Sequence, residues 1–246
     1  MEEAERPLRI TPDMLLSRRL DFEKRMSRRP AVTVGLLAIL ATICFVEATR
    51  GALSSAPALI RAGALSREAV LGGEWWRLVT TIFLHGSVEH LLGNALALYV
   101  LGMVCEHAFG RAQFAFLFLM SGIAGSVLSM TLSPGPSVGA SGAIFGLQGA
   151  AVVLFSRHRA RLLVRSRRIG VVLIAWALFT IMLGFTTPYV DNGAHIGGFL
   201  AGMLIARGLH PIVLEPAPPE AQARMRRQAY VTTAIVVAAA LGWIAR

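Results

Sequence analysis

The chain has 246 residues, of which 55% are apolar and only 15% are charged. Its mean hydropathy is +0.61, whereas a soluble domain of this length carries about 25% charged residues. The net charge of +10 is compatible with nucleic-acid binding, but the basic residues flank apolar blocks and form no patch with interleaved aromatic residues. We therefore expect an all-α polytopic membrane protein, with the lipid bilayer and no nucleic acid as its partner.

The N-terminal segment differs from the rest of the chain. Residues 1–29 contain six acidic and eight basic side chains and no apolar core, so we expect that they are not a signal peptide. We expect this segment to be a polar cytoplasmic tail, with room for a short amphipathic helix.

Seven apolar blocks then predict helices of near-spanning length. The expected helices are 31–48, 86–106, 112–132, 141–156, 169–186, 193–208 and 229–245. A long loop over 49–82 follows the first of them and contains Trp75 and Trp76, whose rings suit the membrane interface. The expected organisation is a tail at 1–29, a six-helix core at 30–209, a charged Pro-rich cytoplasmic linker at 210–228 and an additional transmembrane helix at 229–246.

The distribution of basic residues predicts the orientation. With the N-terminus in the cytoplasm, alternation places 19 of the 24 Lys and Arg residues on the cytoplasmic side, as the positive-inside rule requires. This favours an odd number of spans and an extracytoplasmic C-terminus. We expect a multi-pass protein of a plasma or inner membrane, and the sequence leaves the oligomeric state unknown.

The predicted fourth helix is too short to cross the bilayer. The 15 residues from Ser141 to Phe155 span about 22 Å, less than the ~30 Å of the hydrocarbon core. Because Arg157 marks its cytoplasmic end, Ser141 is expected below the outer membrane surface. Irregular backbone at that depth must line protein or a water-filled cavity. A hydrolase needs such a cavity, since water must reach its site.

Ser141 lies between Gly139 and Gly142 at the start of this helix. Glycine permits close backbone approach, and the unpaired N–H groups of a helix N-terminus suit a developing oxyanion. Helix packing is an equally good interpretation of this motif alone, because Gly142 and Gly146 form a small-xxx-small face.

His195 opens the sixth helix, and Gly198 and Gly202 follow it with Gly-xxx-Gly spacing. If the glycine faces of the two helices pack together, Ser141 can meet His195. Histidine is suited to general-base catalysis near neutral pH. The alternative is a histidine at a loop end that hydrogen-bonds a carbonyl group.

His90 and Asn94 are four residues apart and share one helix face. Both side chains can donate hydrogen bonds to an oxyanion. A metal site made by His85, His90 and His195 is a weaker interpretation, because no carboxylate or H-E-x-x-H pattern supports it. We expect no metal.

No acidic residue is placed to complete a catalytic triad. Asp191 is expected at the surface, and Glu106 lies at the cytoplasmic end of the second helix. A Ser-His dyad, in which packing orients the base, is the better fit.

The chain resembles the rhomboid intramembrane serine proteases over about 70–210. The matching motifs are Trp76-Arg77, His85-xxxx-His90-xxx-Asn94, Glu106-His107-xx-Gly110, Gly139-Ala140-Ser141-Gly142 and Ala194-His195-xx-Gly198-xxx-Gly202. The resemblance implies a six-helix core, here followed by a seventh helix as in some members.

The resemblance also implies the role of each site residue. Ser141 would be the nucleophile and His195 the base, and the N–H of Ser141 with His90 and Asn94 would form the oxyanion hole. Phe145 stands where the family often has Tyr, so its ring is expected to stack on His195 without a hydroxyl group.

The predicted function is a serine endopeptidase that cleaves transmembrane segments of other proteins near the extracytoplasmic face, without a cofactor. One alternative is a non-proteolytic rhomboid-like protein that binds membrane clients. Another is a small transporter, whose broken helices also carry polar groups, although no inverted repeat is visible. The seventh helix is expected to be dispensable for the chemistry.

Overall fold

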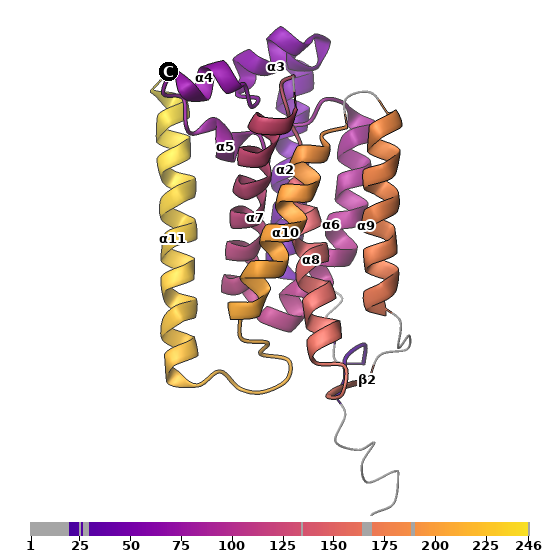
Figure 1. The fold of residues 1–246 in the computed structure, drawn as a ribbon. Helices are drawn as coiled ribbons and strands as arrows, with labels where there is room; N and C mark the ends of the chain where they lie inside the picture. Colours follow the sequence, from indigo (N-terminus) through magenta and orange to yellow (C-terminus); the bar gives the residue numbers. More distant parts are fainter. Residues whose placement is uncertain are drawn as a thin grey trace, which may run out of the picture.

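The computed structural model describes residues 20–24, 26, 30–133, 135–163, 169–187 and 190–245, and these form a helical bundle (Figure 1). Its long helices are α2 (Ala31–Thr49), α6 (Val88–Phe109), α7 (Arg111–Leu132), α8 (Ser141–Arg157), α9 (Ile169–Thr186), α10 (Asn192–Gly208) and α11 (Pro219–Ile244). Five of them, α2, α6, α7, α9 and α11, are long and apolar enough to cross a membrane. The prediction of an all-α polytopic membrane fold is confirmed.

Helix α8 is the central helix of the bundle. Its 17 residues include 13 that are buried, and it packs against α6, α7, α9 and α10. A Cβ atom on Gly198 or Gly202 of α10 would collide with the backbone of Gly142 or Gly146 of α8. The two backbones therefore lie in contact, which only glycine at these positions allows.

The loop predicted over 49–82 contains several short helices at one end of the bundle, the upper end in Figure 1. They are η1 (Ala52–Ser54), α3 (Ala56–Ala62), α4 (Arg67–Leu71) and α5 (Arg77–Thr80). Serine side chains cap two of them: Ser55 accepts a hydrogen bond from the N–H of Ala58, and Ser66 accepts one from Ala69. Such caps satisfy N–H groups that a short helix leaves unpaired.

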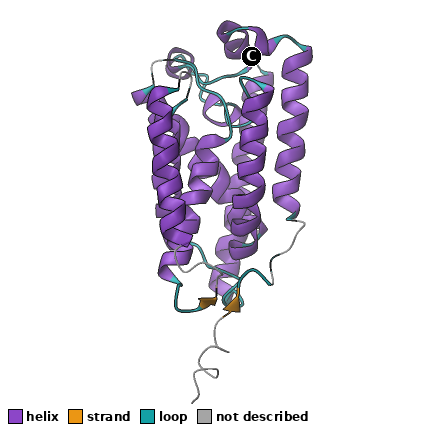
Figure 2. Cartoon of the chain, turned by 90° about the vertical axis from the view of Figure 1, so that its right-hand side faces the viewer, coloured by secondary structure: helices purple, strands orange, loops and turns teal. Residues whose placement is uncertain are grey.

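The opposite end carries a short parallel strand pair, β1 (Leu20–Asp21) with β2 (Leu162–Leu163), visible at the bottom of Figure 2. The next residue, Phe22, is 2% exposed and makes edge contacts with the rings of His107 and Phe155. Part of the predicted tail is thus docked on the bundle. Residues 1–19, 25 and 27–29, where an amphipathic helix was expected, lie outside the described residues.

Helix α11 begins at Pro219, ten residues before the predicted boundary at 229, so the predicted linker over 210–228 is helical from Pro219 onward and non-helical before it. Hydropathy marks only the apolar part of this helix. The start is signalled instead by Pro219 at the first helical position and Glu220 in the first turn, both of which favour a helix N-terminus. The helix has 26 residues.

Glu106 ties α6 to the beginning of α2. Its carboxylate accepts hydrogen bonds from the N–H of Val32 (3.0 Å), the N–H of Thr33 (2.8 Å) and the hydroxyl of Thr33 (2.9 Å). Pro30, at the cap position of α2, supplies no side-chain acceptor. Glu106 therefore caps a neighbouring helix.

Candidate active site

Ser141 and His195 meet inside the bundle. The Nε2 atom of His195 lies 2.9 Å from the Oγ atom of Ser141, and His195 is 6% exposed. Ser141 is the first residue of α8 and His195 lies in the first turn of α10. The glycine contacts between these two helices bring the side chains within hydrogen-bonding distance, as a serine nucleophile and its base require.

The ring of His195 is oriented by an aromatic neighbour. Phe145, one turn after Ser141, stacks on it with ring centroids 4.2 Å apart and an angle of 11° between the planes. Among the described residues, the Nδ1 atom of His195 has no hydrogen-bond partner. The ring is held by packing, and no carboxylate among the described residues hydrogen-bonds to this nitrogen, as one would in the third position of a triad.

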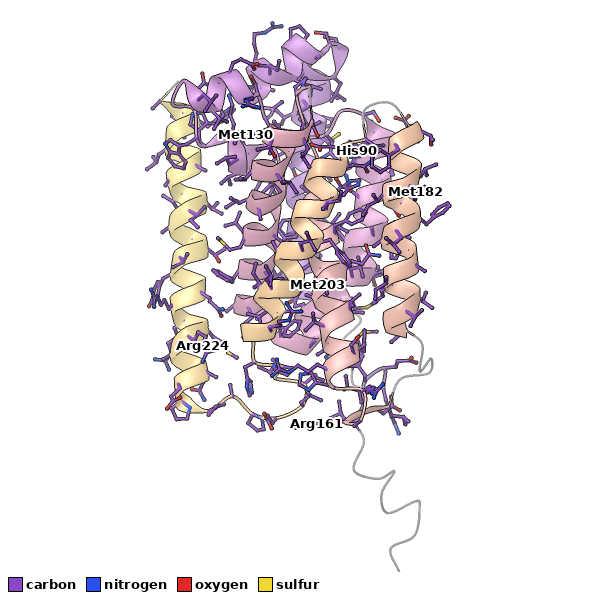
Figure 3. All side chains as sticks on the ribbon, in the orientation of Figure 1. His90, Met130, Arg161, Met182, Met203 and Arg224 are labelled. Atoms are coloured by element: carbon purple, nitrogen blue, oxygen red, sulfur yellow. The ribbon has the colours of Figure 1, made fainter. Side chains whose placement is uncertain are left out.

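His90 and Asn94 of α6 face the backbone just before Ser141. A Cβ atom on Gly139 would lie 2.9 Å from the Nε2 atom of His90 and 3.5 Å from the Nδ2 atom of Asn94. Gly139 has a φ of +125°, and the absence of a side chain lets these donors approach. The Nδ2 group of Asn94 is buried and has no acceptor within the part of the chain that the structure describes. Figure 3 places His90 near the upper end of the bundle.

The segment leading to Ser141 is held by hydrogen bonds that motif analysis did not identify. The N–H of Gly139 donates to the carbonyl of Thr81 (2.9 Å), and the hydroxyl of Thr81 donates to the carbonyl of Ser137 (2.5 Å). Ser137 also forms an antiparallel bridge with Leu65, with N–O distances of 3.0 and 3.2 Å. Because these contacts join distant segments and all but the Thr81 hydroxyl are backbone groups, no residue type signals them.

Asp191 holds the start of α10. It is half-buried, so the expectation that it lies at the surface is wrong. Its carboxylate caps the helix through the N–H of Ala194 (3.0 Å) and accepts hydrogen bonds from the hydroxyls of Ser129 and Ser133 at the end of α7. Burial raises the pKa of Asp191, but these hydrogen bonds, with one from Ser137, outweigh it and hold the pKa below its ordinary value of 3.8.

His85 lies behind His90. Its side chain is 0% exposed, and the two rings are 5.2 Å apart in an edge-on arrangement. The backbone N–H of His85 donates to the buried carboxylate of Glu47 at 3.1 and 3.3 Å, a contact that motif analysis also missed. Among the described residues, no group of three or more His, Cys, Asp or Glu residues is placed to hold a metal ion.

Comparisons with known proteins identify the family of this chain. A family model described as "Rhomboid domain" matches residues 72–212. Rhomboid protease GluP of Bacillus subtilis (strain 168) is 36% identical over 181 residues, which cover 74% of this chain and 35% of that protein. RHOMBOID-like protein 5 of Arabidopsis thaliana is 41% identical over 161 residues (61% of this chain, 49% of that protein).

A third relative, RHOMBOID-like protein 6, mitochondrial, of Arabidopsis thaliana, is 36% identical over 154 residues, covering 61% of this chain and 49% of its own. The matched region spans between about a third and a half of the length of these three relatives. The matched residues 72–212 include Ser141, His195, His90 and Asn94. The chain is a multi-pass membrane protein that belongs to the rhomboid family.

Proposed function

We propose that this protein is an intramembrane serine endopeptidase that uses Ser141 and His195 as a catalytic dyad. The observation that carries the proposal is the 2.9 Å approach of His195 Nε2 to Ser141 Oγ in the interior of an apolar bundle. Two polar side chains at such a depth are costly unless they serve a function. The family membership and the relative named a rhomboid protease support the same conclusion.

In the first step, the Oγ atom of Ser141 attacks the carbonyl carbon of the scissile peptide bond, and Nε2 of His195 takes the hydroxyl proton. This requires the neutral tautomer of His195 with its proton on Nδ1. The imidazolium that forms lies against the face of Phe145, where the negative face of the ring favours a cation. His195 then delivers the proton to the leaving amine.

The oxyanion of the tetrahedral intermediate would form beside the N-terminus of α8. Helix N-termini present unpaired N–H groups and a positive dipole end. The buried Nδ2 group of Asn94, which lacks an acceptor in the described structure, and the ring of His90 are the side-chain donors for this charge. Water then hydrolyses the acyl-enzyme, with His195 again as the base.

The substrates are transmembrane segments of other proteins. A helical peptide bond is sterically shielded, so the substrate must unwind locally to reach Ser141. Small or helix-breaking residues near the cleavage site lower the cost of unwinding. Cleavage would fall near the extracytoplasmic face, because Ser141 starts the short helix α8 on that side of the bundle in the proposed orientation.

The proposed orientation has the N-terminus in the cytoplasm and the C-terminus outside, in a plasma or inner membrane. Figure 3 places Arg161 and Arg224 at the same end of the bundle, opposite His90. An excess of basic residues at one end identifies the cytoplasmic side. Single cysteines introduced at the two ends of the chain and labelled with an impermeant reagent test this: labelling from opposite sides supports an odd number of spans.

The experiment for the activity uses purified protein in detergent or liposomes. A fluorophosphonate probe should attach to Ser141, and a panel of single-span substrates should be cleaved by the wild type. Ser141→Ala and His195→Ala should abolish cleavage, with thermal stability near that of the wild type. Undiminished cleavage by Ser141→Ala would exclude the dyad. A wild type that binds single-span proteins and neither cleaves them nor takes up the probe would instead be a non-proteolytic client-binding protein.

A further inference from the structure

The last residues of α11 contact the segment that connects α2 to α6. Gly242 lies against the indole of Trp76, because a Cβ atom at Gly242 would be only 2.8 Å from Trp76 Cδ1. The next residue, Trp243, donates from its Nε1–H to the carbonyl of Ala62 at 3.3 Å. Figure 1 shows α11 as a separate column whose upper end reaches α4 and α5.

Trp76 and Ala62 belong to a compact hydrogen-bonded unit. Arg77, which is 2% exposed, donates from Nη1 to the carbonyls of Ile60 (2.6 Å) and Ala64 (2.7 Å), and its guanidinium lies 4.7 Å from the Trp76 ring centre. The hydroxyl of Thr80 donates to the carbonyl of Gly63 at 2.8 Å. This unit, residues 60–81, is called here the first-loop unit.

The first-loop unit in turn holds the segment that enters α8. Leu65 pairs with Ser137 through two backbone hydrogen bonds. Thr81 accepts from the N–H of Gly139 and donates to the carbonyl of Ser137. Ser141 is two residues beyond Gly139. A continuous series of contacts therefore leads from Trp243, through the first-loop unit, to the nucleophile.

Helix α11 makes few other buried contacts. In the apolar stretch of 18 residues within α11, 6% of the residues are buried. Over the whole helix, the buried residues are Ala221 and Ala239. A helix that served mainly to complete the hydrophobic core would bury a wide stripe along its length. Helix α11 also packs on α7, and near its start Nη1 of Arg224 donates to the carbonyl of Gly208 at 3.0 Å. At its other end, Gly242 and Trp243 reach Trp76 and Ala62 of the first-loop unit.

We propose that Gly242 and Trp243 are positioning residues, through which α11 braces the first-loop unit and so sets the position of Ser141 relative to His195. The proposal rests on the proposed function and revises the expectation that the seventh helix is dispensable for the chemistry. Without α11 the dyad and the oxyanion donors remain, so cleavage continues, but Ser141 is held less well. Misplacement of a reacting group by about 1 Å can cost up to ~10²-fold in rate.

The test compares full-length variants in detergent. Gly242→Ala pushes a methyl group against Trp76, Trp243→Ala removes the contact with Ala62, and Trp243→Phe keeps a ring while losing the N–H donor. Two control substitutions are made in apolar helices at positions that do not contact the first-loop unit. Gly35→Ala adds the same methyl group on α2 where no atom lies within 4 Å, and Leu241→Ala truncates a side chain of α11 that is 61% exposed.

Three quantities are measured for each variant: the rate of fluorophosphonate labelling of Ser141, kcat and KM for a single-span substrate, and the thermal unfolding temperature. Gly242→Ala and Trp243→Ala should lower the labelling rate and kcat about tenfold, with KM changed less than about twofold. Trp243→Phe should stay within about threefold of the wild type, because it loses only one hydrogen bond. Gly35→Ala and Leu241→Ala should match the wild type.

Labelling rates are compared per folded molecule, so a loss of protein does not imitate a loss of reactivity. Wild-type labelling rates in both Gly242→Ala and Trp243→Ala would overturn the inference, and so would a lower unfolding temperature with unchanged labelling, since α11 would then only stabilise the bundle. A wild type whose Ser141 takes up no probe would instead count against the proposed function itself.

Discussion

The ring of Phe145 lies parallel to that of His195, with an angle of 11° between the planes and 4.2 Å between the centroids. A catalytic histidine in a triad is oriented by a hydrogen bond to a carboxylate. Here the nearest acidic residue along the chain, Asp191, is engaged by Ser129, Ser133 and the N–H of Ala194. The orientation of His195 therefore depends on a packing contact, and that dependence can be tested.

Replacement of Phe145 should impair catalysis more than stability. Phe145→Leu keeps an apolar side chain but removes the stacked face, and we expect kcat to fall about 10- to 100-fold, since a mobile base spends little time aligned with Ser141. Phe145→Tyr should retain most of the activity. Steady-state kinetics and thermal unfolding check both variants; equal kcat for Phe145→Leu and the wild type would show that the stack does not orient His195.

Removal of an oxyanion donor should slow cleavage without abolishing it. Asn94→Ala is expected to lower kcat by roughly 10²–10³, the usual cost of one such donor, while the N–H of Ser141 remains. His90→Ala should act in the same direction. The measurement is kcat and kcat/KM for each single variant. Wild-type values for both would mean that this face of α6 has a different role.

A side chain at Gly202 should separate α10 from α8. A Cβ atom there would collide with the backbone of Gly146, so Gly202→Val should destabilise the protein by about 1–3 kcal/mol or more and inactivate it by moving His195 away from Ser141. Gly35→Val is the matched control, because Gly35 has open space around it. Thermal unfolding and cleavage are measured on both. A stable, active Gly202→Val protein would contradict the packing described above.

The Asp191 carboxylate should make stability depend on acid pH. Because its pKa is lower in the folded protein than its ordinary value of 3.8, it contributes stability above that pH, and the contribution is lost as the pH falls through the folded-state pKa. Asp191→Asn should therefore cost about 1–2 kcal/mol near pH 7 and progressively less below about pH 4. Unfolding temperatures across this range check it; a pH-independent difference would show that the charge is not involved.

Most of the proposed dyad could be predicted from local sequence. Ser141 and His195 each open a helix that carries glycines four residues apart, and such faces permit close backbone contact. The spacing of His90 and Asn94 likewise determines that they share a helix face. The membrane class follows from hydropathy, because spanning helices must be apolar over a defined length.

Other features needed the tertiary structure. The start of α11 was missed because hydropathy does not register the polar turns that precede an apolar span, although Pro219 and Glu220 mark them. The exposure predicted for Asp191 was wrong. The burial of a carboxylate near a helix end depends on its hydrogen-bond partners, and here these are serines from a distant part of the chain.

The sequence by itself determined the membrane class, the helices with their glycine faces and the set of reactive side chains, because each depends on local composition or helical periodicity. Only the tertiary structure decided that Nε2 of His195 lies 2.9 Å from Ser141 Oγ, that Leu65 pairs with Ser137 and that Trp243 reaches Ala62. These contacts join segments far apart in the chain, and the last two use backbone groups that every residue carries, so no local pattern encodes them.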